Sequence, residues 1–397
     1  MRLDTSHFDQ SAADNLSEEE FPVNAIFFRD EFPSVSMPAI LRKIFMEYSS
    51  MPYFDELSLS AQTAYAQLLD SALSADHFRS IADLPGSFAQ KTVKGIRYWY
   101  YQYHEPSGKR AQVFVGPDNE AVQALMARRG QPAATESLIP LARSAIALGC
   151  APVIPRQLKV IGRLADYGFF RAGGVLVGTH AFLAYGNMLG LRWGDSSRTQ
   201  DIDFAHAGKS VSLALPSTVE VKTHNAIESL EMGFLPVAGL SGKSGATYLN
   251  PKEPEFRLDF LTVTHRKGEE IYMHPQLNVP LQPLKFMEFS LENIQQAVLF
   301  SPGSAVLVSV PHPARYALHK LIVYGERAGA FAAKSMKDLH QAASLLAYYR
   351  EHRPWEIDEA WADLVSRGKG WVRRAKQGVE ALDKRYPDLE AGEWLTP

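Results

Sequence analysis

The chain has 397 residues, of which 46% are hydrophobic and 21% charged, as in an ordinary globular protein of two or three domains. No apolar run approaches the roughly 20 residues that span a bilayer, and residues 1–7 lack the apolar core of a signal peptide. We therefore expect a cytoplasmic protein with no membrane partner. The net charge of −3 argues against non-specific electrostatic binding of nucleic acid by the whole chain, but it does not exclude local basic patches.

The single cysteine, Cys150, excludes an internal disulfide and fits a reducing compartment. We expect it to be a small core residue rather than a nucleophile. The histidines show no zinc-ligand spacing.

The first 155 residues predict an N-terminal domain. After a polar arm to about residue 35, helical periodicity covers 57–81, and 117–149 is helical again. Between them, residues 87–118 are rich in aromatic residues and are interrupted by Lys94-Gly95 and Pro106-Ser107-Gly108, which predicts a three-stranded β-meander. The proline-marked junction at 151–155 is the first expected domain boundary.

Residues 156–310 alternate between helix and strand, and residues 311–397 are helical. Helices are expected at 156–170 and 179–190, and strands at 173–178, 201–207 and 255–263, with weaker strands near 211–215 and 272–276. After Pro311-His312-Pro313, helical patterns cover 314–329, 335–352 and 356–384. The fold class is therefore α+β: a mixed sheet with helices, preceded by the helix and meander region and followed by a C-terminal helical domain.

A D-x-D pattern on a predicted strand is the most informative feature of the sequence. Strand side chains alternate with period two, so Asp201 and Asp203 project from the same face. Two neighbouring carboxylates repel each other unless a cation lies between them, and Mg²⁺ bound through carboxylates and substrate phosphates is the usual choice. This indicates phosphoryl or nucleotidyl transfer.

Two further features complete such a site. Gly178-Thr179 lies where a predicted strand gives way to a helix, so the backbone can approach a phosphate and the threonine hydroxyl can donate to it. Asp259 lies among apolar residues on a later strand and needs a partner if it is ionised. This partner is either a metal ion shared with the D-x-D pair, or Arg257, or a cation on a neighbouring strand.

The runs Gly178-Thr179-His180-Ala181, Arg198-Thr199-Gln200-Asp201-Ile202-Asp203-Phe204 and Arg257-Leu258-Asp259-Phe260-Leu261 resemble the polymerase-β-like nucleotidyltransferase superfamily. Within it they are most similar to bacterial AbiEii-like proteins and a related uncharacterised group. The resemblance covers roughly residues 150–350.

The resemblance implies a role for each of these residues. Gly178 and Thr179 would bind the triphosphate, Asp201 and Asp203 would ligate Mg²⁺ or Mn²⁺, and Asp259 would complete the metal site and act as base. Two departures are visible: a threonine occupies the second turn position, and the spacer between the turn and the D-x-D is longer than usual.

Basic residues offer further contacts to the nucleotide. Lys320, Arg327 and Lys337-Asp338 resemble a helical signature of the AbiEii-like proteins, which implies that these helices bring a cation to the nucleotide. Solvated helix faces are the alternative. Arg198 is expected to pair with a phosphate or with a nearby acid.

Two other patterns have competing interpretations. Ser241-Gly242-Lys243-Ser244 lacks the first glycine of a phosphate-binding loop, because position 237 is Val237, and we interpret it as an ordinary loop. In the meander, aromatic residues alternate with cations, which suits stacking on nucleic-acid bases. Strand preference and packing on adjacent helices are the simpler explanation of the same aromatic residues.

The leading hypothesis is a Mg²⁺-dependent enzyme that moves a nucleoside monophosphate from an NTP to a hydroxyl of RNA, protein or a small molecule. The resemblance also implies a toxin or defence role as one version of this hypothesis, with a regulatory partner protein that restrains the activity. A non-catalytic nucleotide- or RNA-binding protein on the same fold is the alternative, and a metal-dependent nuclease is a third possibility.

Overall fold

The computed structural model describes residues 53–77, 87–104, 110–127, 136–193, 199–207, 222–238, 244–264, 270–326 and 332–395. All of them belong to the second of two units into which the chain divides, residues 53–397. The expected N-terminal arm, the strand expected near 211–215, and the side chains of Arg198 and Arg327 lie outside the described residues.

A mixed β-sheet carries the D-x-D strand. Its strands lie in the order β11 (Tyr272–His274), β12 (Val279–Leu284), β10 (Glu253–Val263), β7 (Ile202–His206) and β5 (Gly174–Val177). β7, β10 and β12 run parallel, whereas β5 and β11 are antiparallel to their neighbours. β9 (Ser244–Asn250) pairs with the first half of β10, and β8 (Leu235–Ala238) pairs with β9. Helices pack around this mixed sheet, so the predicted α+β class is confirmed.

The alternation of apolar and polar residues along β10 sets which side chains face the core. Leu258 and Phe260 are buried, whereas Arg257 and Asp259, which alternate with them, are partly exposed on the opposite face. On the core face Phe260 stacks on Phe204 of β7, with ring centroids 5.3 Å apart. Burial of these apolar side chains therefore fixes the direction in which the polar side chains of the same strands point.

Helix α5 precedes strand β5 in the chain, and helix α6 follows it from Gly178. α5 (Pro155–Asp166) begins with proline, whose fixed φ suits the first helical position. The helix expected to reach residue 170 ends at Asp166, because Gly168 takes a left-handed φ of 87° that a helix cannot continue through. α6 (Gly178–Leu189) follows β5 directly and ends at Gly190, which has a φ of 74°.

A β-hairpin that the sequence analysis missed, β13 (Ile294–Ser301) and β14 (Ser304–Pro311), lies between the sheet and the N-terminal helices. It shares a hydrophobic core with α2 (Leu59–His77) and α4 (Leu138–Ala147). The expected helical stretch 117–149 contains α3 (Glu120–Ala127) and α4. Cys150 is 2% exposed in this core, as predicted. β1 (Asp55–Glu56) and β6 (Leu191–Arg192) form a separate, short antiparallel pair.

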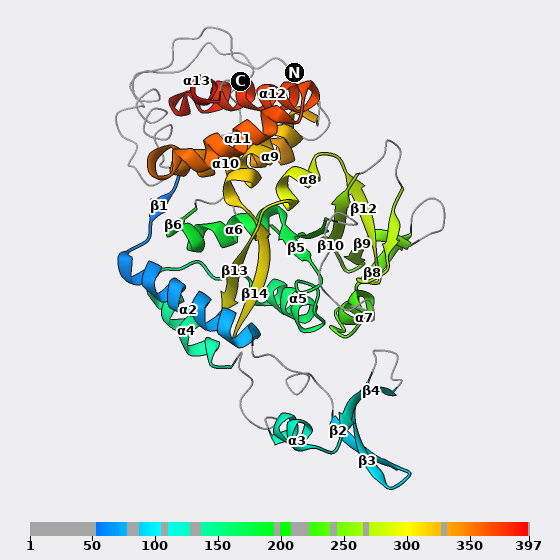
Figure 1. Ribbon diagram of the computed structural model, residues 1–397. Helices are drawn as coiled ribbons and strands as arrows, with labels where there is room; N and C mark the ends of the chain where they lie inside the picture. Colours follow the sequence, from blue (N-terminus) through cyan, green and yellow to red (C-terminus); the bar gives the residue numbers. More distant parts are fainter. Residues whose placement is uncertain are drawn as a thin grey trace, which may run out of the picture. The chain divides into compact units, whose positions relative to one another are not determined.

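The C-terminal helices are α9 (Pro313–Glu326), α10 (Ala332–His352), α11 (Pro354–Ser366) and α12 (Lys369–Arg385), orange to red in Figure 1. α9 packs against α10, α11 and α12. The single helical stretch expected at 356–384 is two helices, because Gly368 between them has a φ of 106°. After α12 the chain forms the 3₁₀ helix η6 (Pro387–Leu389) and α13 (Ala391–Trp394). Two short helices, α7 (Thr223–Glu228) and α8 (Met287–Leu291), precede α9 in the chain. The domain boundaries near 155 and 310 stay predictions.

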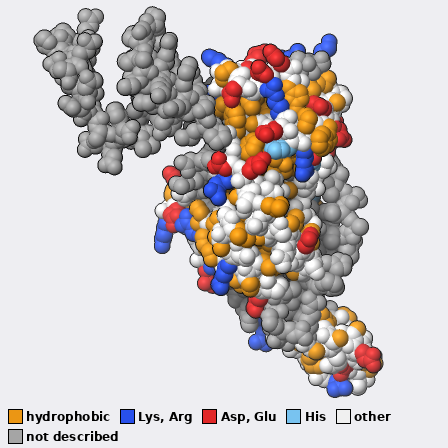
Figure 2. Space-filling model, turned by 90° about the vertical axis from the view of Figure 1, so that its left-hand side faces the viewer, with side chains coloured by type: hydrophobic (Ala, Val, Ile, Leu, Met, Phe, Trp, Pro, Cys, Tyr) orange, Lys and Arg blue, Asp and Glu red, His pale blue; other side chains and the backbone are white. Residues whose placement is uncertain are grey.

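The predicted meander is confirmed as an antiparallel sheet of β2 (Ser87–Val93), β3 (Ile96–His104) and β4 (Arg110–Pro117). Among the helices in the described ranges, none is long and apolar enough to cross a membrane. On the face shown in Figure 2, acidic and basic side chains are interspersed, which agrees with the nearly balanced charge of the sequence.

Candidate active site

Three carboxylates come together on the two central parallel strands. Asp203 on β7 is the register partner of Asp259 on β10, and Asp201 directly precedes β7. Asp201 and Asp259 retain side-chain exposures of 26% and 19%. The three acids that the sequence predicted as one site are therefore neighbours, although they come from segments more than 50 residues apart.

Gly178 lies directly against Asp203. A Cβ atom at position 178 would lie 2.1 Å from Oδ2 of Asp203, and the glycine has a φ of 62°. Both the space and the backbone conformation therefore require glycine here. Thr179 follows in the first turn of α6 and is 8% exposed. The predicted turn is thus placed at the carboxylates.

Arg257 lies between two of the three acids. Its Nη2 is 3.4 Å from Oδ2 of Asp201 and its Nε is 3.1 Å from Oδ2 of Asp259, the latter at an angle that leaves Nε without a hydrogen bond. Thr247 donates a hydrogen bond of 2.6 Å to the other oxygen of Asp259. Within the described ranges, no three His, Cys, Asp or Glu side chains converge as a preformed metal cluster. The guanidinium supplies part of the positive charge that the carboxylates require.

The pKa values of Asp201 and Asp203 are shifted in opposite directions. Burial, followed by repulsion from Asp201 and Asp259, raises the pKa of Asp203 to about 6. Burial also acts to raise the pKa of Asp201, but the hydroxyl of Thr199, Arg257 and other cations outweigh it, and the pKa is lowered. Of these two acids, only Asp203 therefore has its charged form disfavoured.

Lysines of α9 and α10 interact electrostatically with the carboxylates. Lys320 Nζ lies 2.5 Å from Oδ1 of Asp338, and its charge also lowers the pKa of Asp203. Burial lowers the pKa of Lys337, while Asp201 and Asp203 act to raise it, which places this lysine near the acids. The sequence analysis missed Lys334, whose charge lowers the pKa of both Asp201 and Asp203.

Two buried polar residues that were also missed support the turn. The hydroxyl of Tyr316 on α9 lies 2.9 Å from the carbonyl oxygen of Gly178 and 2.8 Å from Oε1 of Gln341 on α10. Gln341 in turn donates to Oγ1 of Thr179 over 3.4 Å. Their helical spacing of four residues from Lys320 and Lys337 could have indicated them, since such residues share a helix face.

A chain of hydrogen bonds also supports the segment before the D-x-D pattern. His180 is fully buried, and its Nε2 lies 3.1 Å from Oε1 of Gln157, which as an amide oxygen accepts the hydrogen bond. Gln157 donates to the carbonyl oxygen of Thr199 over 2.6 Å, and the Thr199 hydroxyl donates to Asp201. His180 is thus a packing residue that positions the acids through α5.

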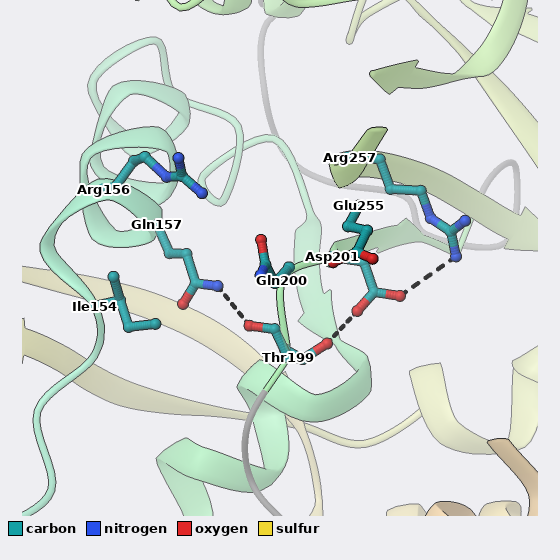
Figure 3. Close-up of a pocket in the computed structure, with 8 residues that line it drawn as sticks. All are labelled: Ile154, Arg156, Gln157, Thr199, Gln200, Asp201, Glu255 and Arg257. Atoms are coloured by element: carbon teal, nitrogen blue, oxygen red, sulfur yellow. Dashed lines mark hydrogen bonds and ion pairs between the residues drawn. The ribbon is translucent and has the colours of Figure 1, made fainter. Parts of the chain in front are cut away.

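A cavity of about 600 Å³ opens beside Asp201 (Figure 3). It lies between the start of α5, the segment before β7 and the first half of β10. Side chains of both charges and several amide or hydroxyl groups line it; these are Ile154, Arg156, Gln157, Thr199, Gln200, Asp201, Glu255 and Arg257. The cavity offers a polar ligand a place next to one carboxylate.

Comparison with known proteins identifies the class. A family profile described as Nucleotidyltransferase matches residues 156–366, which include the three acids, the Gly178 turn and the supporting helices. The match spans more than half of the chain, and the protein belongs to this nucleotidyltransferase family. The AbiEii-like subgroup stays a prediction.

Among solved structures, an antigenic nucleotidyltransferase-like protein from Paracoccidioides brasiliensis is similar at 16% sequence identity, with a TM-score of 0.28. The similarity covers 57% of this chain and 95% of the other. No curated protein matches this chain.

Proposed function

We propose that this protein transfers a nucleoside monophosphate from an NTP to an acceptor hydroxyl and requires Mg²⁺. The observation that carries the proposal is the meeting of Asp201, Asp203 and Asp259 beside the Gly178 turn. Carboxylate oxygens are ligands that Mg²⁺ prefers. Burial and repulsion from the two other acids raise the pKa of Asp203, and a bound cation would offset that repulsion. The chemistry of the donors therefore supports this ion, which would have to draw the carboxylates together, since they form no preformed cluster within the described ranges.

In the proposed reaction the acceptor oxygen forms a bond to the α-phosphorus, the bond from that phosphorus to the bridging oxygen breaks, and pyrophosphate leaves. Asp259 accepts the proton of the acceptor hydroxyl. When bound, Mg²⁺ supplies charge stabilisation for the attacking and leaving oxygens. Asp201 and Asp203 would hold it, together with Asp259.

The remaining residues orient the nucleotide. Gly178 and Thr179 are the first residues of helix α6. The N–H groups of a first helical turn have no partner within the helix and can bind phosphate oxygens, and the Thr179 hydroxyl can donate to the same oxygens. Lys320 and Lys334 add positive charge on the side of α9 and α10. Tyr316 and Gln341 keep the turn in place and do not contact the substrate in this proposal.

The test is label transfer and pyrophosphate release. The protein is incubated with each α-labelled NTP, Mg²⁺ and an extract of RNA and protein. The matched controls are the Asp201→Asn/Asp203→Asn variant and the surface variant Asp70→Asn, which changes the same chemistry on an exposed helix position. Label that Asp70→Asn retains and the double variant loses supports the proposal. Equal labelling by the double variant would overturn it.

One observation favours a second candidate, a nucleotide-binding protein without catalysis. Arg257 already contacts Asp201 and Asp259, as an arginine that replaces a metal would. Equilibrium binding of Mn²⁺ separates the two candidates. Binding that depends on Asp203 supports the transferase, whereas nucleotide binding that is unaffected by Mn²⁺ or chelator supports the second candidate.

A further inference from the structure

The two faces of the meander differ in burial: one carries the buried Tyr101, whereas the described residues leave the other partly exposed. On the first face Tyr101 is 1% exposed and packs edge-on against Phe88 with ring centroids 5.2 Å apart. Trp99 donates from Nε1 to Asp118 over 3.2 Å, and Arg97 forms an ion pair of 3.0 Å with the same aspartate. These side chains are therefore committed to holding the meander together.

The opposite face carries a different set of aromatic residues. Phe114 on β4 is 56% exposed, and its ring lies 5.5 Å from that of its cross-strand partner Tyr100 and 5.9 Å from that of Tyr98. Lys91 on β2 lies over the Tyr100 ring at 4.6 Å, and its Nζ is 2.7 Å from Oε1 of Gln112. Three rings and a cation thus share one face. We call these four residues, Lys91, Tyr98, Tyr100 and Phe114, the aromatic platform.

The charge of the meander is one-sided. Its three strands contain Lys91, Arg97 and Arg110, the β2–β3 turn contains Lys94, and none of the strands contains an aspartate or glutamate. Arg97 is paired with Asp118 just after β4, so the excess of positive charge comes from Lys91, Lys94 and Arg110. The whole chain has a net charge of −3, so this local excess of positive charge is not a general property of the protein. A polyanion is therefore favoured over a basic or neutral surface as the partner.

We propose that the aromatic platform binds single-stranded nucleic acid. Unpaired bases expose flat faces that stack on Phe114 and the tyrosines, whereas a duplex keeps its bases inside. Lys91, which lies over the Tyr100 ring, and Lys94, in the β2–β3 turn, are both exposed and can contact phosphates. Strand pairing alone holds the Phe114 ring 5.5 Å from the Tyr100 ring and 5.9 Å from the Tyr98 ring, so the stacking surface exists before a ligand binds. This binding is independent of the proposed transfer reaction.

The test measures binding by the full chain with Asp201→Asn/Asp203→Asn in place and without NTP, so that failure of catalysis cannot affect the result. A fluorescein-labelled 12-nucleotide single strand of mixed sequence is titrated at several salt concentrations, with anisotropy as readout. Phe114→Ala and Lys91→Gln change the platform at exposed positions. Phe114→Tyr retains the ring, and Trp355→Ala removes a ring that is 60% exposed elsewhere.

Phe114→Ala is expected to weaken binding by about 5- to 100-fold, as for removal of one stacking partner. Lys91→Gln should weaken binding and reduce its salt dependence. Phe114→Tyr and Trp355→Ala should bind like the parent. The proposal is overturned by absence of strand binding, by equal binding of a 12-base-pair duplex, or by parent-like affinity of Phe114→Ala. Self-association that Phe114→Ala abolishes, without strand binding, would assign the face to protein contacts instead.

Discussion

Gly178→Ala is the substitution for which the structure gives the clearest expectation. Gly178 has a φ of 62°, and a left-handed conformation costs a residue with a Cβ about 1–2 kcal/mol. The new Cβ would also lie 2.1 Å from Oδ2 and 3.0 Å from Cγ of Asp203, closer than atoms can approach. Displacing a packed neighbour typically costs about 1–3 kcal/mol more. The free energy of unfolding should therefore fall by about 2–5 kcal/mol.

Gly233→Ala is the matched control. Gly233 has a φ of 76°, but the nearest atom to its added Cβ is Oδ1 of Asn250 at 4.0 Å, an ordinary contact. Its cost is that of the backbone conformation alone, about 1–2 kcal/mol. The difference between the two variants measures the collision with Asp203.

The assay is urea unfolding of the metal-free protein, followed by circular dichroism. A double-mutant cycle with Asp203→Ala removes Oδ2 and Cγ and leaves only the Cβ of residue 203, at 3.2 Å. Asp203→Ala should recover about 1–3 kcal/mol of the loss caused by Gly178→Ala. Equal destabilisation by Gly178→Ala and Gly233→Ala, or additive effects in the cycle, would refute the close approach of the turn to the carboxylate.

Three further predictions follow from neighbouring contacts. Arg257→Gln removes the cation that contacts two of the carboxylates, so Mn²⁺ should bind about tenfold more tightly by calorimetry; unchanged or weaker binding would contradict this. Tyr316→Phe removes the hydroxyl at the carbonyl of Gly178 and should lower the free energy of unfolding by about 1 kcal/mol, together with NTP affinity; parent-like values for both would argue against its positioning role. Burial lowers the pKa of His274 to about 4, so its contribution to stability is present above the unfolded value near 6.5 and is lost as the pH falls from there towards 4. His274→Gln should therefore reduce the loss of unfolding free energy between pH 7 and pH 4.5 by about 2 kcal/mol, and an unchanged pH profile in urea unfolding would exclude this.

The acids could be predicted from sequence because strand periodicity is local. Asp201 and Asp203 lie two residues apart, and Asp259 alternates with Leu258 and Phe260, so the hydrophobic pattern already indicated which side chains leave the core. The Gly178 turn was recognisable for a similar reason, since it joins a short apolar strand to a helix. By contrast, the β13–β14 hairpin was missed because its pattern does not distinguish a buried strand from other apolar segments.

The sequence by itself therefore determined the α+β class, the three acids, the glycine turn and the aromatic meander. These features depend on residue type and on spacings of two to four residues. Only the tertiary structure decided that Arg257 lies between two of the acids, that Tyr316 and Gln341 hold the turn, and which face of the meander is partly exposed. The physical reason is that these contacts join segments far apart in the chain, and burial of the core, rather than any local preference, sets which side chains meet.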